Sequence, residues 1–153
     1  MAGICFFFED NDIDMYSGRV IDLEAWNYAT QAGGEDMKDM LVLNCTGVFG
    51  DYQDIRTPNK RFNFESRKHS GRDPHPELKG RVAYFMIPTD KRVQKSLWDF
   101  DHEVDWYCFG PAHSDHFQPE KEDVCITIPL PVQLHAVHTA NIVMAHRYHV
   151  RNS

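Results

Sequence analysis

The sequence predicts an α/β fold, in which a mostly parallel sheet carries helices on both faces. Short unbroken apolar runs recur along the chain, as they do in strands that are covered on both sides. Stretches with helical periodicity lie between these runs, and such alternation is typical of parallel sheets. With 153 residues, of which 42% are hydrophobic, the chain is long enough to form one domain, residues 1–153, around a core of its own.

The N-terminal elements begin with the apolar run Gly3–Phe8, which predicts a buried strand. A helix is expected over residues 17–32, because Ser17 suits its N-cap and the pair Gly33–Gly34 ends it. The run Asp39–Gly47 predicts the second strand. The helix is expected to turn one side toward the core, formed by Val20, Leu23, Trp26, Asn27 and Thr30.

The C-terminal half predicts three more strands, Arg81–Asp90, Val104–Pro111 and Asp123–Leu130. Thr89 suits the cap of a helix after the first of these, because apolar residues follow it at helical spacing: Val93, Leu97 and Phe100. Residues 136–149 predict a closing helix, whose inward side is expected to consist of Val137, Ala140, Met144 and Tyr148.

The middle of the chain, about Phe49–Gly80, is polar and rich in Gly, Pro and basic residues, and it predicts a mostly irregular insert. The net charge is −7, yet residues 56–95 hold eleven Lys and Arg against four acidic residues, so this stretch carries +7 and the remainder −14. Phe62 and Phe64 interleave with the cations, a mixture that suits single-stranded or looped RNA. A solvated loop anchored by these two rings is the alternative. The candidate RNA-binding residues are Arg56, Lys60, Arg61, Arg67, Lys68 and Arg72.

The three C-terminal strands end alike, in the sequences MIPT (86–89), CFGP (108–111) and TIPL (127–130). Proline removes a donor and restricts the direction in which the chain leaves the strand, and glycine lets a ligand approach the backbone closely. Ligands of parallel sheets bind beyond the carboxyl ends of the strands. The sequence therefore predicts a pocket lined by main-chain groups, suited to an adenine and a ribose.

These motifs carry a family resemblance. The sequences FGPAHSDHF, VCITIPL and HTANIVMAHRY, in this order before the chain's end, resemble the C-terminal half of the SPOUT methyltransferases. The nearest likeness is to the small single-domain tRNA 2′-O-ribose methyltransferases, and the opening ICFFFEDNDIDMYSGRVIDLEAW is similar to that group's first strand, turn and helix. The resemblance implies a C-terminal trefoil knot, binding of S-adenosylmethionine, a homodimer formed through the first and last helices, and an RNA substrate such as tRNA.

Carried onto this chain, the resemblance implies three cofactor-binding loops and the turn Leu134–His138 before the last helix. The loop residues are Ile87, Pro88, Thr89, Phe109, Gly110, Pro111, Ile128, Pro129 and Leu130, and His138 joins them from the turn.

The polar positions of the family are exchanged here. Ala112 stands in place of the glutamate after FGP, Asp22 in place of the first-helix arginine, and His138 in place of the asparagine that opens the last helix. Arg19 lies one turn before Asp22 and is a candidate to replace the arginine. Methyl transfer to a hydroxyl needs a group that accepts its proton, and an imidazole does so near neutral pH. His138 and Arg19 are therefore the candidate catalytic residues.

Other polar clusters offer alternatives. The histidine pairs of the last helix, His135 with His138 and His146 with His149, have helical spacing, but a zinc site needs three or four ligands and no metal site is predicted. We expect these histidines to be exposed or at a dimer interface. A hydrolase that uses the cluster at residues 113–116, with His113, Asp115 and His116, is an unrelated alternative.

The four cysteines are scattered in apolar runs without a CxxC pair, which predicts reduced, buried thiols and a cytoplasmic protein. No run approaches the ~20 apolar residues of a membrane span. The preferred hypothesis is an S-adenosylmethionine-dependent RNA methyltransferase with a diverged active site. The alternative is a catalytically inactive relative that binds RNA or a protein partner as a dimer.

Overall fold

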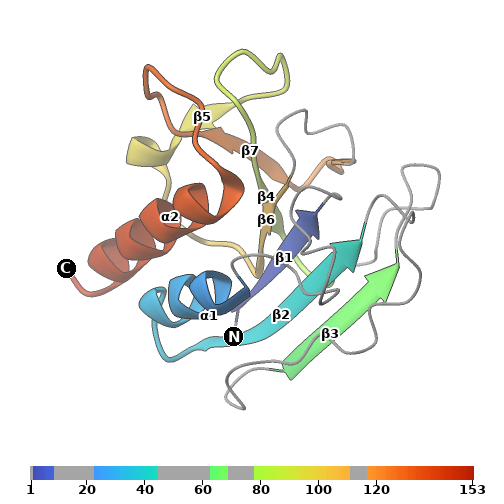
Figure 1. The fold of residues 1–153 in the computed structure, drawn as a ribbon. Coiled ribbons are helices and arrows are strands. Elements are labelled where there is room, and N and C mark those ends of the chain that lie inside the picture. The colour runs from blue at the N-terminus through green and yellow to red at the C-terminus, as the bar shows by residue number, and fades with distance from the viewer. Residues whose placement is uncertain (1, 9–22, 45–62, 69–77, 111–116) are drawn as a thin grey trace.

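The computed structural model describes residues 2–8, 23–44, 63–68, 78–110 and 117–153. They form a seven-stranded sheet in which every neighbouring pair is parallel, in the order β3-β2-β1-β6-β4-β7-β5 (Figure 1). The strands are β1 (Ala2–Phe8), β2 (Met37–Asn44), β3 (Asn63–Lys68), β4 (Val82–Phe85), β5 (Lys95–Ser96), β6 (Trp106–Phe109) and β7 (Val124–Thr127). The helices are α1 (Leu23–Ala32), α2 (Ala136–Arg151) and the short 3-10 helix η2 (Leu97–Asp99).

The five predicted strands are confirmed, the first over its whole expected range and the other four over part of theirs. β1, β4, β6 and β7 are almost entirely buried, because neighbouring strands or packed side chains cover both their edges and their faces. Such strands need continuous apolar sequence, and this is the signal by which the sequence predicted them.

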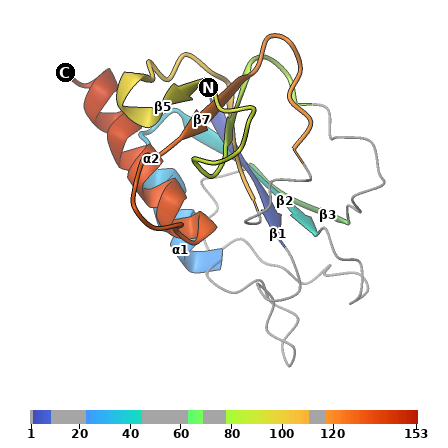
Figure 2. The ribbon, with the colours of Figure 1, turned by 90° about the horizontal axis from the view of Figure 1, so that it is seen from above.

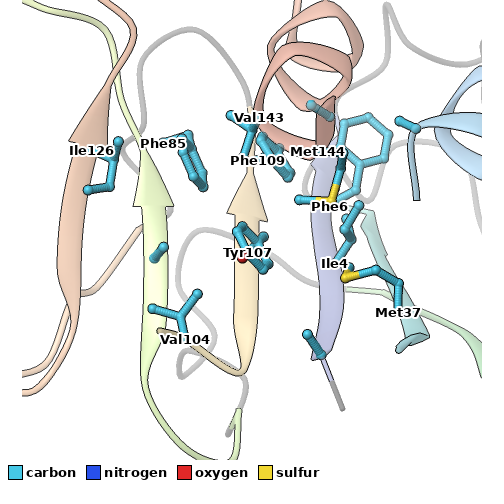
Figure 3. Packing of buried hydrophobic residues seen from close by; sticks show 14 of the residues in the cluster. Ile4, Phe6, Met37, Phe85, Val104, Tyr107, Phe109, Ile126, Val143 and Met144 are labelled. Carbon is cyan, nitrogen blue, oxygen red and sulfur yellow. The ribbon is translucent and has the colours of Figure 1, made fainter. Parts of the chain in front are cut away.

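Both α-helices lie side by side on the same face of the sheet (Figures 1 and 2). The main core fills the space between them and the sheet, with Ile4 and Phe6 of β1, Tyr107 and Phe109 of β6, and Met144 of α2 packed together (Figure 3). On the opposite face, alternate side chains of the same strands pack against residues from connections: Leu78, Val93 and Phe117. Within the described residues, the prediction of helices on both faces therefore holds for one face only.

The first helix follows its prediction where it is described. Trp26, Asn27 and Thr30 are buried, as the helical spacing indicated. The helix ends before Gly34, whose φ of +124° lies in the region that favours glycine. Ser17 and Val20 lie outside the described residues.

The predicted helix after Thr89 is wrong. The segment instead makes two successive turns, from Asp90 N to Ile87 O (3.0 Å) and from Val93 N to Asp90 O (3.2 Å), and then pairs with β7 as the short strand β5. Gln94 fixes this pairing, because its backbone N donates to Cys125 O (2.9 Å) and its side-chain Oε1 accepts from Cys125 N (3.0 Å). The open edge of β7 offered backbone groups that a helix would have left unpaired.

The insert is not wholly irregular, which corrects a second expectation. Asn63–Lys68 forms the edge strand β3, paired in parallel with β2 from Asp39↔Asn63 to Asn44↔Lys68. An edge strand needs no continuous apolar sequence, so its polar composition concealed it.

The closing helix is confirmed, but one residue of its inward side is not. Val137, Ala140 and Met144 are buried, whereas the side chain of Tyr148 is 53% exposed. Arg147 takes the inward place instead.

Neither helix of the described residues combines the length and the hydropathy that crossing a membrane requires. Cys5, Cys108 and Cys125 are buried free thiols, as expected.

Candidate functional site

The chain leaves β4, β6 and β7 through short segments that contain proline or glycine, which we call the strand exits. The three exits lie next to one another. β6, β4 and β7 are neighbours in the sheet, with Tyr84 paired to both Cys108 and Cys125. All strands run in the same direction, so the chain leaves these three strands at one edge. We call this the carboxyl edge; the opposite one, where the strands begin, is the amino edge.

The exit of β4 is a tight turn with exposed residues at its tip. Met86 N donates to Ile126 O (2.9 Å), which holds the end of β4 against β7. The chain then turns through Ile87, Pro88 and Thr89, and the last two are exposed. The turn therefore presents backbone groups at the carboxyl edge.

The exit of β6 is held by aromatic packing. Phe109 is buried and its ring stacks on that of Phe85, with centroids 4.8 Å apart. A Cβ on Gly110 would come within 2.8 Å of the ring of Phe117, so this position requires glycine. Phe117 is itself fixed between Phe7 and Tyr84, with centroid distances of 5.2 Å to each. Pro111 lies outside the described residues.

The exit of β7 bends at Pro129, where Leu130 N donates to Ile128 O (2.8 Å). Just before it, Thr127 is 8% exposed and its hydroxyl has no hydrogen-bond partner among the described residues. The same is true of Trp26 Nε1 and Asn27 Oδ1 on α1. An orphaned buried hydroxyl is costly, and at a strand exit it is a feature that a bound ligand would relieve.

The start of α2 lies beyond the exit of β7. His135 is the N-cap, and its carbonyl accepts from the amides of His138 (3.0 Å) and Thr139 (3.1 Å). The His138 side chain is exposed in the first turn, with its ring 6.1 Å from that of His135 between centroids. His138 is thus free to meet a ligand from solvent.

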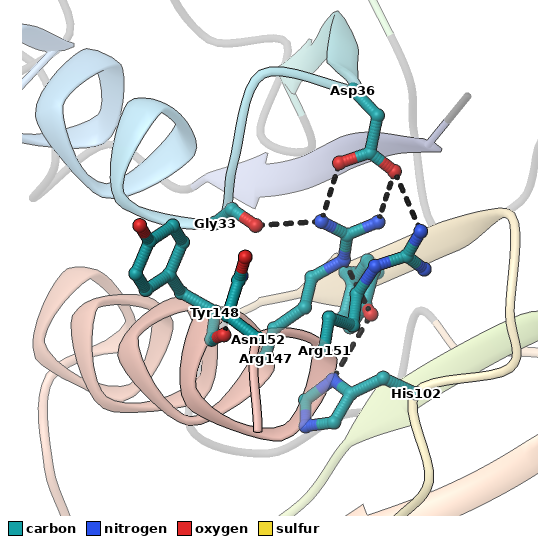
Figure 4. Close-up of polar contacts among 8 residues, drawn as sticks. Gly33, Asp36, His102, Arg147, Tyr148, Arg151 and Asn152 are labelled. Carbon is teal, nitrogen blue, oxygen red and sulfur yellow. Dashed lines mark hydrogen bonds and ion pairs between the residues drawn. The ribbon is translucent and has the colours of Figure 1, made fainter.

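A second polar cluster, at the amino edge, was not foreseen from the sequence (Figure 4). Arg147 of α2 is 1% exposed, and its Nη1 donates to Gly33 O (2.6 Å) and Asp36 Oδ1 (2.9 Å). Its Nη2 donates to Asp36 Oδ2 (2.7 Å) and its Nε to the hydroxyl of Tyr107 (3.0 Å). The hydrogen bonds from Arg147 lower the pKa of Asp36 to about 2.

The cluster continues through two histidines. His102 Nδ1 lies 3.0 Å from the Tyr107 hydroxyl, and His102 Nε2 lies 2.7 Å from His146 Nδ1. Donation of the Tyr107 proton to His102 Nδ1 gives this buried hydroxyl both a donor and an acceptor role, and in that tautomer His102 carries its own proton on Nε2 and donates it to His146. Burial is the main cause that lowers the pKa of His102 to about 3, which keeps the ring neutral.

His146 is half-buried by this contact, whereas the other three histidines of the last helix, His135, His138 and His149, are exposed; a place at a dimer interface stays a prediction. Burial also lowers the pKa of the His146 ring. Among the described residues no group of three or more His, Cys, Asp or Glu is arranged to hold a metal ion. His113, Asp115 and His116 lie outside the described residues.

Most of the other predicted site residues also fall outside the described part of the chain. These are Arg19 and Asp22, Ala112, and the RNA-binding candidates Arg56, Lys60, Arg61 and Arg72. The backbone of Arg67 and Lys68 is described: both end the edge strand β3, opposite Leu43 and Asn44 of β2. They therefore lie at the carboxyl edge, as the candidate cofactor loops do.

A sequence signal for part of the amino-edge cluster existed. Arg147 continues the buried helical spacing of Ala140 and Met144, and a charged residue at such a position requires a buried partner. The identity of that partner, Asp36, had no signal because it comes from a turn far away in the sequence.

No protein-family model and no curated protein matches the sequence. Solved structures do match: one that concerns the 2-OH methylation of C/U34 on tRNA covers 99% of this chain and 97% of its own, with a TM-score of 0.50 and 14% identity. The SpoU methyltransferase AviRb from Streptomyces viridochromogenes, solved with AdoMet, covers 99% of this chain with a TM-score of 0.55 and 11% identity. This chain has the fold of the SpoU methyltransferases. It spans 61% of the AviRb chain. The resemblance to the SPOUT methyltransferases that the strand-exit motifs indicated is thereby confirmed at the level of the fold, and the trefoil knot stays a prediction.

Proposed function

We propose that the protein binds S-adenosylmethionine at the carboxyl edge and methylates RNA. The observation that carries the proposal is the adjacency of the three exits, 87–89, 109–110 and 128–130, on the neighbouring strands β4, β6 and β7. Main-chain groups from all three meet at one edge, which is the place where parallel sheets bind ligands. The SpoU-like fold supports the same reading, and one of the similar structures contains AdoMet.

The residues present fit such a cofactor. Backbone N–H and C=O groups at the exits suit an adenine and a ribose, and the orphaned hydroxyl of Thr127 offers one further hydrogen bond. When bound, S-adenosylmethionine supplies a methyl group that its sulfonium activates for transfer. The chain's own contribution is to orient the acceptor and to remove a proton from it.

In this proposal His138 removes that proton. Its imidazole is exposed in the first turn of α2, the element that follows the exit of β7, and an imidazole nitrogen is a suitable general base for a hydroxyl. Arg19 takes the part of the family's first-helix arginine. The basic residues from Arg56 to Arg72 hold the RNA, with tRNA as the first acceptor to test. Arg67 and Lys68 end β3 at the same edge as the exits, which supports this assignment.

The proposal also includes the quaternary and topological features that the family resemblance implies. The segment after β7 forms a trefoil knot, and two copies associate through α1 and α2. Tyr28 on α1 and Tyr148 on α2 support such a contact, since their side chains are 62% and 53% exposed.

A second candidate function is a non-catalytic relative that binds the cofactor, RNA or a protein. The exchanges at Asp22, Ala112 and His138 favour it, because they remove the family's polar side chains while the exits that suit a cofactor remain.

The first test is calorimetric titration with S-adenosylmethionine and then S-adenosylhomocysteine. We expect saturable binding near micromolar Kd, about −8 kcal/mol. Thr127→Val is an informative variant: removal of an orphaned buried hydroxyl should raise the free energy of unfolding by about 1 kcal/mol and weaken cofactor binding. Wild-type protein that is folded but binds neither compound would contradict the proposal.

Turnover separates the two candidates. With bound cofactor and tRNA, methyl incorporation is expected for the wild type and its loss for His138→Ala, whose exposed position should leave stability unchanged within about 0.5 kcal/mol. Unchanged turnover in His138→Ala would remove His138 from the mechanism. Cofactor binding without incorporation into any RNA would favour the non-catalytic relative.

A further inference from the structure

Arg92 connects two of the strand exits that form the proposed cofactor site. We propose that Arg92 is a positioning residue, which holds the exits of β4 and β6 at a fixed separation. This inference rests on the proposed function, because the separation matters for binding only if the cofactor lies between these exits.

The guanidinium of Arg92 has two different partners on its two sides. Its Nε and Nη2 donate to the two carboxylate oxygens of Asp90, at 3.1 and 2.9 Å, and its backbone N also donates to that carboxylate, at 2.9 Å. Its Nη1 points away from Asp90 and donates to the carbonyl of Phe117, at 2.8 Å. A single rigid fork therefore joins the turn after β4 to the segment after β6.

Each partner is firmly tied to one exit. Asp90 belongs to the turn that leaves β4, since its amide donates to Ile87 O (3.0 Å) and its carbonyl accepts from Val93 N (3.2 Å). Phe117 is buried against Phe7 and touches the position of Gly110 at the exit of β6. Loss of the hydrogen bond between Arg92 and Phe117 should therefore change the distance between the exits of β4 and β6.

The link requires arginine in particular. The side chain of Asp90 is 13% exposed, and the hydrogen bonds from Arg92 lower the pKa of its carboxyl, so the pair stays charged at neutral pH. An ammonium is a point donor on a flexible stem, and it lacks the planar fork that meets a carboxylate and a carbonyl at once. We expect lysine at this position to keep the ion pair and to lose the hydrogen bond to Phe117.

Arg81 provides a matched control at the other end of β4. Its Nε and Nη1 donate to the carbonyls of Glu122 (3.2 Å) and Glu103 (3.3 Å), so it also bridges two connections, at the amino edge. Both arginines flank the same strand and both hold carbonyl groups. They differ in that only Arg92 lies beside the proposed cofactor site.

The experiment compares Arg92→Gln, Arg92→Lys and Arg81→Gln by titration with S-adenosylhomocysteine and by amide hydrogen exchange. We expect both Arg92 variants to bind at least 10-fold more weakly than the wild type, with faster exchange in residues 86–96 and 117–120. Arg81→Gln should exchange faster around residues 103–105 and 122–124 and bind within twofold of the wild type.

Three outcomes overturn the assignment: Arg92→Gln that binds as the wild type does, Arg92→Lys that restores full affinity, or Arg81→Gln that weakens binding as much as Arg92→Gln. If the wild type binds no S-adenosylhomocysteine, the result contradicts the proposed function. The role of Arg92 in holding the two exits is then tested by the hydrogen-exchange data alone. Unchanged exchange in residues 86–96 and 117–120 of Arg92→Gln would then show that Arg92 does not hold the two exits.

Discussion

The two edges of the sheet are built from different chemistry. At the amino edge, hydrogen bonds of side chains hold the elements together. Arg147 is buried and donates to Asp36, Gly33 and Tyr107, and the hydrogen bonds continue from Tyr107 to His102. At the carboxyl edge, the exits of β4 and β7 are main-chain turns with exposed prolines, and the hydroxyl of Thr127 beside the second is orphaned.

This difference separates stability from function. A buried cluster whose donors and acceptors are paired with one another has nothing left to offer a ligand, but its disruption is costly. Turns with open backbone groups contribute less to stability and leave groups for a ligand. We therefore expect substitutions at the amino edge to act mainly on the free energy of unfolding, and those at the carboxyl edge mainly on binding.

The largest effect is expected for Arg147→Met. The change leaves the buried Gly33 carbonyl without its donor and removes the buried one of the two arginines that pair with Asp36, so the free energy of unfolding should fall by about 2–4 kcal/mol. Urea denaturation measures it. Arg151→Met is the control, since Arg151 also reaches Asp36, at 3.3 Å, but its side chain is 48% exposed, and about 1 kcal/mol or less is expected. Equal losses in both variants would contradict a special role of the buried arginine.

The amino edge should also make stability depend on pH. The pKa of His102 is about 3 in the folded protein against an ordinary value of 6.5, so below pH 6.5 the unfolded chain takes up a proton that the folded one does not. The free energy of unfolding should fall as pH drops from 6.5 toward 3, by at most about 1.4 kcal/mol per pH unit from this group.

Urea unfolding of the wild type and His102→Gln at several pH values measures this contribution. The variant has no titrating ring at this position, so its stability should fall less steeply between pH 6.5 and 4. Identical slopes for the two proteins would show that His102 titrates in the same way when folded and unfolded.

A smaller loss is expected for Gly110→Ala at the carboxyl edge. The added methyl group would meet the ring of Phe117 at 2.8 Å, and displacement of this packed ring should cost about 1–3 kcal/mol. The double variant with Phe117→Leu tests the cause, because a smaller side chain relieves the contact and the two losses should then be less than additive. Strict additivity in thermal or urea denaturation would place the strain elsewhere.

The smallest effect on stability is expected for Pro129→Ala, together with a clear effect on binding. Pro129 is exposed, so the variant should lose about 1 kcal/mol or less, chiefly because the unfolded chain gains freedom. Its affinity for S-adenosylhomocysteine should fall several-fold, because the exit of β7 is no longer restrained. Pro131→Ala is a matched control, exposed and outside the exit, and should bind as the wild type does. Equal binding by all three proteins would argue against a cofactor at this exit.

The sequence by itself determined five of the seven strands, β1, β2, β4, β6 and β7, and the position of the exits. Parallel strands that are covered on both faces need unbroken apolar residues, so Gly3–Phe8 and the runs before Pro88, Gly110 and Pro129 could be recognised without a partner in view. The closing helix was recognisable for a similar reason, since its helical spacing of apolar residues lies within the segment itself.

Only the tertiary structure decided what the less apolar segments do. The residues after Thr89 have helical spacing, yet they pair with β7, because the open edge of that strand needed hydrogen bonds. The polar strand β3 exists because β2 is beside it. The cluster around Arg147 joins Asp36, Tyr107 and His102, residues that the fold alone brings together. A hydrogen bond between distant segments forms only when the fold brings both partners together, so the local sequence of neither segment predicts it.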